Sequence, residues 1–491
     1  MNFEYIRYIL GSILIFQGGF MLIPSGVALI YKEHTGISFL ISSTICLVIG
    51  ILLTRKKPRN NAFYAKEGFF SVAICWVAFS VSGALPFIIT QEIPSVTDAL
   101  FEIVSGYTTT GSTILPDVEA LSKCLLFWRS FTHWIGGMGV LVFVLCVLPL
   151  AGGNNMHLMR AESPGPSVGK LVPRIRSTAM ILYGIYTALT VMECILLLLG
   201  GMSFFDAITT SFGTAGTGGF GIKNSSIADY NTFIQNVVAV FMVLFGVNFN
   251  IYFLLLVRKP KQALKSEEMC SYFGIILIST ILIAINIKSS YASLGTSFQQ
   301  AFFQVSSIIT TTGFSTTDFN LWPTFSKTIL VLLMFIGACG GSTGGGIKVS
   351  RIVIAWKNVR NEVASFIHPK SVHTVRMEGK KVSNDIVRSV NTYIVIYILV
   401  FVVSVLLISL EGFSLETSFT SVAATLNNIG PGLDGVGPLE NFAGFSVFSK
   451  CILMFDMLAG RLELIPMVVL FSPRSWNANS QVSTAVTNLK F

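Results

Sequence analysis

The sequence predicts an all-α polytopic membrane protein built from four tandem helix–loop–helix repeats, preceded by two extra N-terminal transmembrane helices. Composition and internal repetition predict this fold. Of the 491 residues, 52% are hydrophobic and only 12% are charged, whereas soluble domains carry about 25% charged residues. Such a chain cannot bury its apolar side chains in one water-soluble core. In addition, one polar segment recurs four times, each time between two apolar stretches.

Apolar stretches of the length needed to cross a bilayer, roughly 17–25 residues, recur along the chain. We expect spans at 10–30, 37–54, 69–90, 138–151 with its upstream extension, 178–200, 234–257, 272–287, 328–338, 392–410 and 446–472. The first stretch lacks a small-residue cleavage site, which predicts a retained helix rather than a signal peptide.

The distribution of charge predicts how the chain is oriented in the membrane. Lys and Arg cluster at 55–59, 160–176, 258–265 and 351–388, in loops that simple threading places on one side. Cytoplasmic loops carry such an excess, so we expect these loops and the C-terminus in the cytoplasm. This clustering explains the net charge of +9 without nucleic acid, which we do not expect as a partner. The opposite loops are acidic, which raises the local concentration of cations.

The residues that usually carry catalysis or hold a metal show no grouping. The eight cysteines have no CxxC spacing, and the five histidines are scattered, so neither a disulfide framework nor a metal site of this kind is predicted. A membrane-embedded enzyme would need paired carboxylates, a histidine cluster or an activated nucleophile within the spans. We therefore expect no enzyme, no catalytic residues and no organic cofactor.

The repeated polar segment ends in glycine, and four copies of equal length match without a gap. They are 98–111 DALFEIVSGYTTTG, 206–219 DAITTSFGTAGTGG, 300–313 QAFFQVSSIITTTG and 417–430 TSFTSVAATLNNIG. The first residues of the copies are polar and are expected to cap a short helix: Asp98, Asp206, Gln300 and Thr417. Six residues before the final glycine every copy is small: Ser105, Gly213, Ser307 and Ala424.

One repeat thus contains a span, a half-helix, a polar strand and a second span, and its two crossings give every copy the same orientation. Non-helical backbone at membrane depth is tolerated only where it is buried in protein or lines a watery path. Four parallel helix–pore-loop–helix repeats would place their carbonyls around a central pore. The partly negative C-terminal ends of the half-helices would point at it, and the final glycine permits the required φ values. A buried turn without a ligand would be the better interpretation of a single copy.

The segments TTTGST, GTGGFG, TTTGFST and NNIGPGL resemble the selectivity-filter loops of the Trk/Ktr/HKT superfamily of potassium transporters, especially its TrkH-type pore subunits. FWRSFTHWIGGMGVLV (127–142), RAESPGP (160–166), GACGGSTGGGIKVSR (337–351), HPK (368–370) and AGRLELIP (459–466) match TrkH stretches in the same order. The resemblance implies that K⁺ is the transported ion and that backbone around each filter glycine coordinates it. The implied filter residues are Thr109, Thr110, Gly111, Thr217, Gly218, Gly219, Thr311, Thr312, Gly313, Asn428, Ile429 and Gly430.

The resemblance carries further expectations about selectivity and assembly. Some plant members that carry Na⁺ have serine at the first filter glycine, so the four glycines present here favour K⁺. The resemblance also implies a homodimer, a cytoplasmic TrkA-like nucleotide-binding regulatory subunit and the cytoplasmic (inner) membrane of a prokaryote, where the lipid bilayer is the surrounding partner.

The run GACGGSTGGG at 337–346 interrupts the second span of the third repeat with six glycines in ten residues. Each costs a helix about 1 kcal/mol relative to alanine. A nucleotide-binding loop is excluded because Ile347 separates the last glycine from Lys348, and close packing of small residues explains only one or two of the glycines. The resemblance implies an intramembrane gate beneath the filter. Its residues are Gly340, Gly341, Ser342, Thr343, Gly344, Gly345, Gly346 and Lys348.

Arg461 lies within the last apolar stretch, where a charge is costly and usually faces a cavity or a partner. One interpretation is an ion pair with Glu463 or Asp456, although spacings of two and five residues do not favour pairing within one helix. The resemblance implies instead an arginine that projects into the pore under the filter. There it would form part of the gate and oppose the flow of cations.

The predicted organisation is 1–66 for the two N-terminal helices, then pore repeats 67–160, 161–265, 266–387 with the glycine-rich loop, and 388–491. The predicted function is potassium uptake through a channel-like pore with a filter made by four pore loops. An ion-coupled symporter, driven by H⁺ or Na⁺ and having the same fold, stays open as the alternative. Secondary transporters commonly use inverted repeats, whereas the copies here are parallel.

Overall fold

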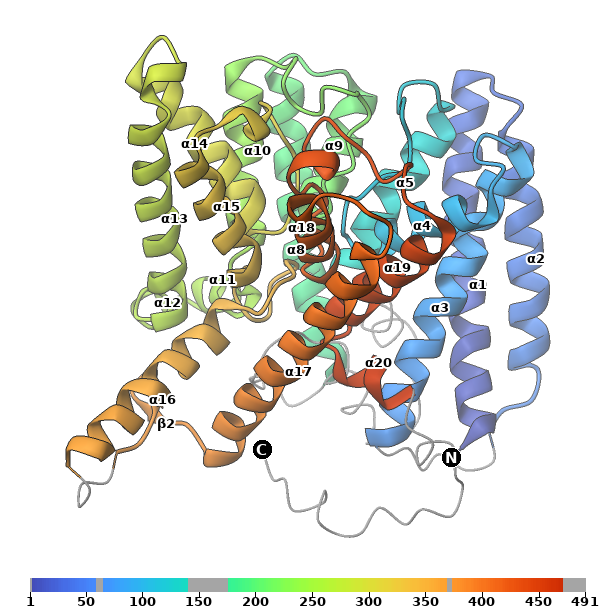
Figure 1. Cartoon of the computed structure of the whole chain (residues 1–491). Helices are drawn as coiled ribbons and strands as arrows, with labels where there is room; N and C mark the ends of the chain where they lie inside the picture. The colour runs from blue at the N-terminus through green and yellow to red at the C-terminus, as the bar shows by residue number, and fades with distance from the viewer. Residues whose placement is uncertain (1, 59–64, 140–174, 369–372, 471–491) are drawn as a thin grey trace.

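The computed structural model describes residues 2–58, 65–139, 175–368 and 373–470, and these residues are almost wholly helical (Figure 1). The helices are α1 Phe3–Tyr31, α2 Gly36–Thr54, α3 Ala65–Thr90, α4 Val96–Tyr107, α5 Lys123–Gly137, α8 Ile175–Leu199, α9 Phe204–Gly216, α10 Thr232–Phe245, α11 Phe249–Leu256, α12 Pro260–Leu264, α13 Glu267–Asn286, α14 Leu294–Ile309, α15 Thr324–Ile336, α16 Val349–Ile367, α17 Asn384–Ser409, α18 Leu415–Leu426, α19 Val447–Arg461 and α20 Ile465–Leu470. Three single 3₁₀ turns, at Lys288–Ser290, Phe319–Leu321 and Asp434–Val436, and a two-stranded hairpin of β1 Arg376–Met377 and β2 Lys380–Lys381 complete the described elements.

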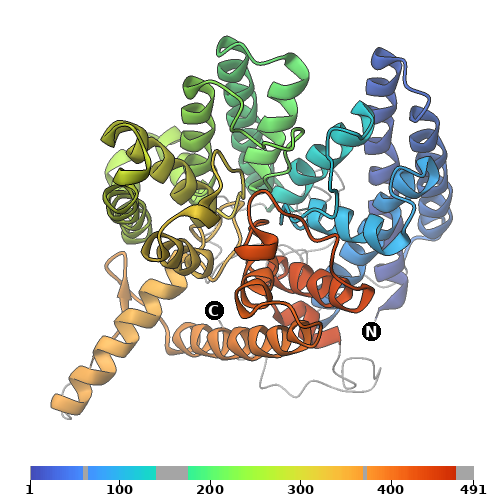
Figure 2. The ribbon, with the colours of Figure 1, turned by 45° about the horizontal axis from the view of Figure 1, so that its top comes forward.

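Four helical units surround one centre, as Figure 2 shows. They are α3–α5, α8–α11, α13–α15 and α17–α19, and in each unit the second helix is a pore helix of 12 to 16 residues. The pore helices are α4, α9, α14 and α18. Helices α1 and α2 pack together beside the first unit (Figure 1). They approach closely because both carry glycine at the contact: a Cβ on Gly11 would lie 2.8 Å from the carbonyl oxygen of Gly50, the small-residue packing typical of membrane helices.

The apolar stretches of the sequence coincide with helices, except that 138–151 falls largely outside the described residues. Among the described residues, six helices are long and apolar enough to cross a membrane: α1, α2, α3 from Gly68, α8 from Ala179, α13 and α17. The bent pair α10–α11 would make a seventh span. The prediction of a polytopic all-α membrane protein is confirmed.

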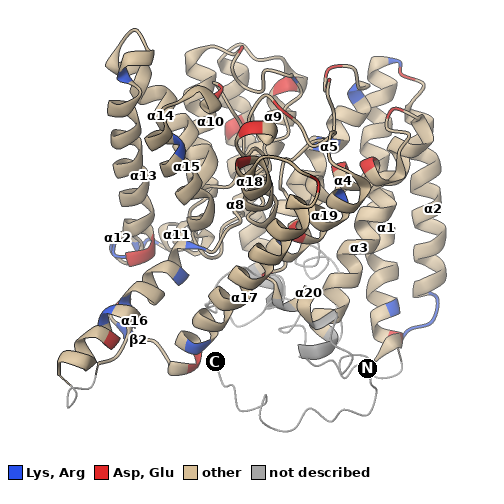
Figure 3. Cartoon of the chain, in the orientation of Figure 1, with Lys and Arg blue, Asp and Glu red and all other residues tan. Residues whose placement is uncertain are grey.

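Charged side chains are unevenly distributed along the axis of the bundle. In the view of Figure 3, acidic residues gather over the upper loops and basic residues at the lower ends of the helices, including α16. This is the asymmetry expected of a chain whose basic loops face the cytoplasm. The pore helices lie in the upper half of the bundle in Figure 1, away from the basic end.

The expected capping positions of the pore helices are wrong. The N-caps are serines that precede the repeated segment: Ser95, Ser203, Ser293 and Ser414. In three repeats the expected cap is instead the third helical residue, whose backbone N–H bonds to the serine hydroxyl oxygen; these residues are Asp98, Asp206 and Thr417. Gln300 lies further inside α14. Serine caps a helix as well as aspartate and better than threonine, and an acidic residue in the first turn is favoured by the helix dipole.

The second helices of the second and fourth repeats end earlier than their apolar stretches, 234–257 and 446–472, predict. Helices α5, α10, α15 and α19 have 15, 14, 13 and 15 residues, too few to cross a bilayer, which takes about 20. Continuous spans at 234–257 and 446–472 were expected wrongly: α10 and α11 meet at an 89° bend, and α19 ends at Arg461. At the latter break Glu463 and Leu464 have left-handed φ values of 59° and 64°, which no helix can contain.

A buried ion pair ties the first two repeats together beside the filter. The Arg129 guanidinium on α5 donates to Glu102 on pore helix α4 at 2.7 Å, and both side chains are almost fully buried. Glu102 also accepts from the backbone N–H of Ile114 at 3.0 Å. Arg129 reaches the second repeat by a 3.2 Å bond to the Gly221 carbonyl and lies 4.1 Å from the centre of the Phe220 ring.

Removing one member of this pair should destabilise the protein strongly. Glu102→Ala leaves a buried guanidinium without its carboxylate, a change that costs roughly 3–5 kcal/mol, so the melting temperature in detergent should fall sharply. The matched control is Glu416→Ala, which breaks the exposed 3.3 Å pair with Lys327; exposed pairs contribute about 0–1 kcal/mol. Equal melting temperatures for the two variants would contradict this structural role.

Candidate functional site

The four pore helices end in the same hydrogen-bond pattern. In the first repeat the N–H of Thr109 bonds to the Gly106 carbonyl at 3.1 Å, and the N–H of Thr110 bonds to the Ser105 carbonyl at 2.9 Å. The corresponding bonds are Thr217 to Thr214 and Gly218 to Gly213, Thr311 to Ile308 and Thr312 to Ser307, and Asn428 to Thr425 and Ile429 to Ala424. This pair of bonds is a Schellman motif, which turns the chain out of the helix and satisfies its last carbonyls.

The Schellman motif explains the small residue found six positions before each filter glycine. That residue supplies the carbonyl that accepts the bond from the N–H five residues later, as Ser105 does for Thr110. In the second repeat a Cβ on Gly213 would lie 2.8 Å from the Phe314 ring of the third repeat. In the third, the Ser307 hydroxyl donates to the Phe314 carbonyl at 2.6 Å. Larger side chains here would push neighbouring loops apart.

The residue two positions before each filter glycine adopts the left-handed conformation, a feature that the sequence did not predict. The φ angles are 57° at Thr109, 55° at Thr217, 59° at Thr311 and 55° at Asn428. Asparagine tolerates this region, but β-branched threonine is a real outlier in it. Such a conformation costs of order 1–3 kcal/mol and persists only where the surrounding structure fixes it. Threonine at three of the four positions marks a functional site rather than a simple helix end.

The filter glycines and the carbonyls of neighbouring repeats close a ring. A Cβ on Gly111 would lie 2.1 Å from the carbonyl oxygen of Gly218, and one on Gly219 would lie 2.0 Å from that of Thr312. A Cβ on Gly313 would lie 2.0 Å from the Ile429 carbonyl oxygen, and one on Gly430 would lie 2.9 Å from that of Thr110. Each repeat therefore presents a backbone carbonyl to the glycine of the preceding one, in the order 1–2–3–4–1. All twelve filter residues predicted from the sequence lie in these four strands.

The glycines of this ring also have positive φ: 84° at Gly111, 73° at Gly219, 88° at Gly313 and 102° at Gly430. Both the backbone conformation and the lack of space thus exclude a side chain. All four glycines line one cavity of about 120 Å³, together with residues from all four repeats. The strands therefore open into a shared vestibule.

The threonine hydroxyls of the filter have partners within the protein. Thr110 and Thr108 hydroxyls lie 2.8 Å apart, and the Asn428 side chain donates to the Thr110 hydroxyl at 2.9 Å. Asn428 also donates to the Met457 carbonyl on α19 at 2.9 Å. The Thr311 hydroxyl accepts a 2.6 Å bond from the backbone N–H of Gly345. The hydroxyls hold the strands and leave the backbone carbonyls as the oxygens directed at neighbouring strands.

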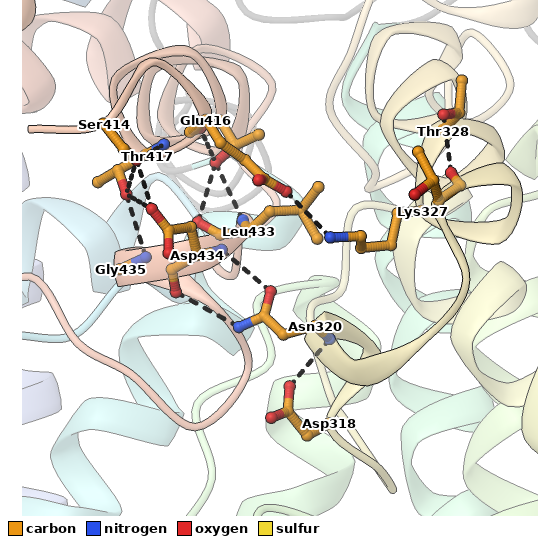
Figure 4. Close-up of polar contacts among 12 residues, drawn as sticks. Asp318, Asn320, Lys327, Thr328, Ser414, Glu416, Thr417, Leu433, Asp434 and Gly435 are labelled. Atoms are coloured by element: carbon orange, nitrogen blue, oxygen red, sulfur yellow. Dashed lines mark hydrogen bonds and ion pairs between the residues drawn. The ribbon is translucent and has the colours of Figure 1, made fainter. Parts of the chain in front are cut away.

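A polar network beyond the filter glycines holds the fourth filter strand against the third repeat (Figure 4). The Asp434 carboxylate accepts from the hydroxyls of Ser414 and Thr417, and these donors lower the pKa of Asp434. The Asn320 side chain accepts from the Asp434 N–H at 3.0 Å and donates to its carbonyl at 3.3 Å. Since Asp434 follows the filter glycine by four residues, this contact fixes the exit of the strand.

The glycine-rich segment 337–348 separates α15 from α16 and packs directly under the filter. A Cβ on Gly345 would lie 2.3 Å from the Asn427 carbonyl oxygen, and one on Gly344 would lie 2.8 Å from that of Thr310. Its glycines thus permit close contact with the filter base, in addition to the broken helix predicted from the sequence. The Lys348 ammonium donates to the Gly344 carbonyl, which fixes the end of the segment.

The glycine-rich segment also fills the break between α10 and α11. The N–H of Cys339 bonds to the Gly246 carbonyl at 3.1 Å, and the N–H of Phe249 bonds to the Gly341 carbonyl at 3.0 Å. Glu268 on α13 accepts a 2.6 Å bond from the N–H of Gly340. These bonds satisfy backbone groups that the two broken helices expose, as the interior of a membrane protein requires. Nothing in the sequence pattern had pointed to Glu268.

Arg461, at the end of α19, reaches across to two other repeats. Its guanidinium donates to the carbonyls of Gly136 at 2.5 Å and Gly137 at 2.7 Å at the end of α5, and to Thr343 in the glycine-rich segment at 2.8 Å. The residues considered as its ion-pair partners have other contacts. Glu463 pairs with Arg351 on α16, and Asp456 accepts a 2.7 Å bond from Ser404. The structure thus brings Arg461 and the predicted gate segment together.

Comparison with known proteins places the chain among transport proteins. A sequence model of the TrkH family, described as cation transport protein, matches residues 36–285 and 277–479. The Trk system potassium uptake protein TrkH of Salmonella typhimurium is 38% identical over 483 residues, which cover 97% of this chain and 100% of the relative. The Trk system potassium uptake protein TrkG of Escherichia coli K12 is 34% identical over 493 residues, with the same coverage.

The fold agrees with a solved structure as well. The crystal structure of the potassium transporter TrkH from Vibrio parahaemolyticus matches with a TM-score of 0.87 and 34% sequence identity, covering 97% of this chain and 100% of that one. Sequence and fold therefore agree over nearly the whole length, including the two N-terminal helices. The chain belongs to the TrkH family of cation transport proteins.

Proposed function

We propose that this protein takes up potassium ions across the cytoplasmic membrane of a prokaryote, through a channel-like pore whose selectivity filter is formed by the four pore loops. The closed ring of filter glycines and neighbouring carbonyls carries the proposal. Rings of backbone carbonyls replace the hydration shell of K⁺ in selective pores. The relatives named as potassium uptake proteins support the choice of ion.

In this proposal the backbone of Thr109–Gly111, Thr217–Gly219, Thr311–Gly313 and Asn428–Gly430 coordinates K⁺. The four pore helices direct their C-terminal, partly negative ends toward the ring, which favours a cation. The segment Gly340–Gly346 with Lys348 and Arg461 acts as the gate. Its bond from Gly345 to the Thr311 hydroxyl couples the gate to the filter, and the three carbonyl contacts of Arg461 hold it closed.

We also propose a homodimer and a cytoplasmic nucleotide-binding regulatory subunit of the TrkA type as partners. Helix α16 extends away from the bundle on the basic side (Figures 1 and 3). It exposes large apolar side chains, with Trp356 71% and Phe366 85% exposed. An apolar surface of this kind on an extended helix is suited to contact with protein, and the gate segment leads directly into it.

The function is tested by Rb⁺ uptake into liposomes that contain the purified protein, with and without competing Na⁺. Uptake that follows the Rb⁺ gradient alone and resists Na⁺ supports a K⁺-selective pore. Uptake that requires an imposed H⁺ or Na⁺ gradient would support the alternative, an ion-coupled symporter of the same fold. Absence of Rb⁺ uptake by a folded protein, with its regulatory subunit supplied, would overturn both.

Replacing Gly111 by serine should weaken the discrimination of K⁺ from Na⁺. The new Cβ would displace the Gly218 carbonyl from the ring, and the φ of 84° strains any side chain. We expect the Rb⁺/Na⁺ uptake ratio to fall about tenfold, which corresponds to roughly 1.4 kcal/mol. The control is Gly184→Ser on α8, where a Cβ meets no atom within 4 Å. An unchanged ratio in folded Gly111→Ser protein would show that the filter is assigned to the wrong residues.

Changes in the glycine-rich segment should alter flux and leave selectivity largely intact. Gly345→Ala, and more strongly the triple replacement of Gly344–Gly346 by alanine, pushes the segment off the Asn427 carbonyl and loosens its bond to Thr311. Rates of Rb⁺ uptake and the Rb⁺/Na⁺ ratio are measured on one preparation. Gly274→Ala on α13, where a Cβ meets no atom within 4 Å, is the control. A large loss of selectivity at unchanged flux would argue against a gate.

Arg461→Ala should raise the flux of Rb⁺. It removes a charge that repels cations in surroundings of low dielectric constant and also the three bonds that hold the gate segment to α5. Arg461→Lys keeps the charge but cannot reach three carbonyls as a planar guanidinium does, so its flux should be intermediate. Detergent melting on the same samples separates a purely structural role, which predicts an unstable and inactive alanine variant.

A further inference from the structure

The second filter strand differs from the other three at one position of the ring. Repeats 1, 3 and 4 have Thr110, Thr312 and Ile429 directly before the filter glycine, whereas repeat 2 has Gly218. The carbonyls of all four take part in the ring. Gly218 does not have a positive φ, so its backbone conformation does not require glycine. Something other than local conformation excludes a side chain here.

The imidazole of His133 occupies the side-chain position that Gly218 leaves empty. A Cβ on Gly218 would lie 1.9 Å from Nδ1 of His133, 2.3 Å from Cγ and 2.4 Å from Cε1. His133 belongs to α5 of the first repeat and is fully buried. Its ring also packs against Phe220, just beyond the filter glycine, with the ring centres 4.3 Å apart. The imidazole thus contacts the strand on both sides of Gly219.

The main chain of His133 supports the same strand at a second point. A Cβ on Gly216 would lie 2.3 Å from the His133 carbonyl oxygen. This contact is with backbone, whereas the contact at Gly218 is with the side chain. Substitutions at Gly218 therefore test the contact with the imidazole, and substitutions at Gly216 test the contact with the main chain of α5.

We infer that His133 is a positioning residue of the selectivity filter: its imidazole takes the place of the side chain at Gly218 and holds the Gly218 carbonyl against Gly111. This inference rests on the proposed filter function. In repeats 1 and 3 the strand carries its own threonine, which is anchored by hydroxyl contacts such as the 2.8 Å pairs of Thr108 with Thr110 and Thr310 with Thr312. In repeat 2 the anchor comes from the neighbouring repeat.

The inference predicts that a side chain added at Gly218 can replace the support lost when the His133 imidazole is removed. In His133→Ala the strand loses its support, and the Rb⁺/Na⁺ uptake ratio should fall about tenfold. Gly218→Thr alone should do the same, because the threonine collides with the ring. The double variant His133→Ala with Gly218→Thr restores one side chain in the space, as in repeats 1 and 3. Its ratio should return to within about twofold of the original.

In the matched control, the added side chain collides with the main chain of His133 instead of with its imidazole. Gly216→Ala meets the His133 carbonyl, so adding His133→Ala should bring no recovery. If adding His133→Ala restores the uptake ratio of Gly216→Ala as well as that of Gly218→Thr, the His133→Ala change only loosens the packing around the strand, and the inference is overturned. An unchanged ratio in His133→Ala, or a double variant no better than the single ones, would also overturn it. If a single variant does not fold, the melting temperature of the double variant is the readout: recovery supports the inference, and no recovery overturns it. Original protein that takes up Rb⁺ without discriminating it from Na⁺ would instead refute the proposed filter.

Discussion

The closed ring at the filter is the constraint on which the rest of the structure depends. Four strands approach so closely that a Cβ on Gly219 or Gly313 would lie 2.0 Å from a neighbouring carbonyl oxygen. Such an approach at membrane depth leaves backbone groups without helical partners, and these must be satisfied by the protein itself. The Schellman motifs, the strained threonines and the small residues of the pore helices all serve this requirement. A strand that moved outward would open a gap on both of its sides, because each one contacts two neighbours.

The same requirement governs the region beneath the filter. The second helix of every repeat stops after 13 to 15 residues, and each ending exposes carbonyls. Arg461 satisfies two of them at the end of α5, while the glycine-rich segment satisfies those at the break between α10 and α11. The predicted gate is therefore also the partner of these broken ends. If the segment is the gate, as proposed, its opening requires other donors, such as water, to replace those bonds.

Much of this fold could be predicted from the sequence, and the features that could not be predicted have identifiable physical reasons. Composition locates the spans, and the in-register glycines locate all four filter strands, because these signals are local. The caps were misplaced since Asp98 and Ser95 are both polar and only the structure shows where the helix begins. The left-handed Thr109 contradicts the preference of threonine, so no propensity could indicate it. Glu268 and His133 act through contacts with residues far away in the sequence, Gly340 and Gly218, which a single sequence does not reveal.

Because the four pore units are fused in one chain, their sequences can differ. In this structure, different repeats carry different specialised features. A symmetric assembly of identical subunits would repeat each device four times. Here the arginine under the filter belongs to the fourth repeat, the glycine-rich segment to the third, and the glycine at the ring position of Gly218 to the second. Each contacts another repeat: Arg461 contacts α5, Gly345 contacts the Asn427 carbonyl, and Gly218 contacts His133. Since these contacts cross between repeats, a change in any one unit is transmitted to the geometry of the whole ring.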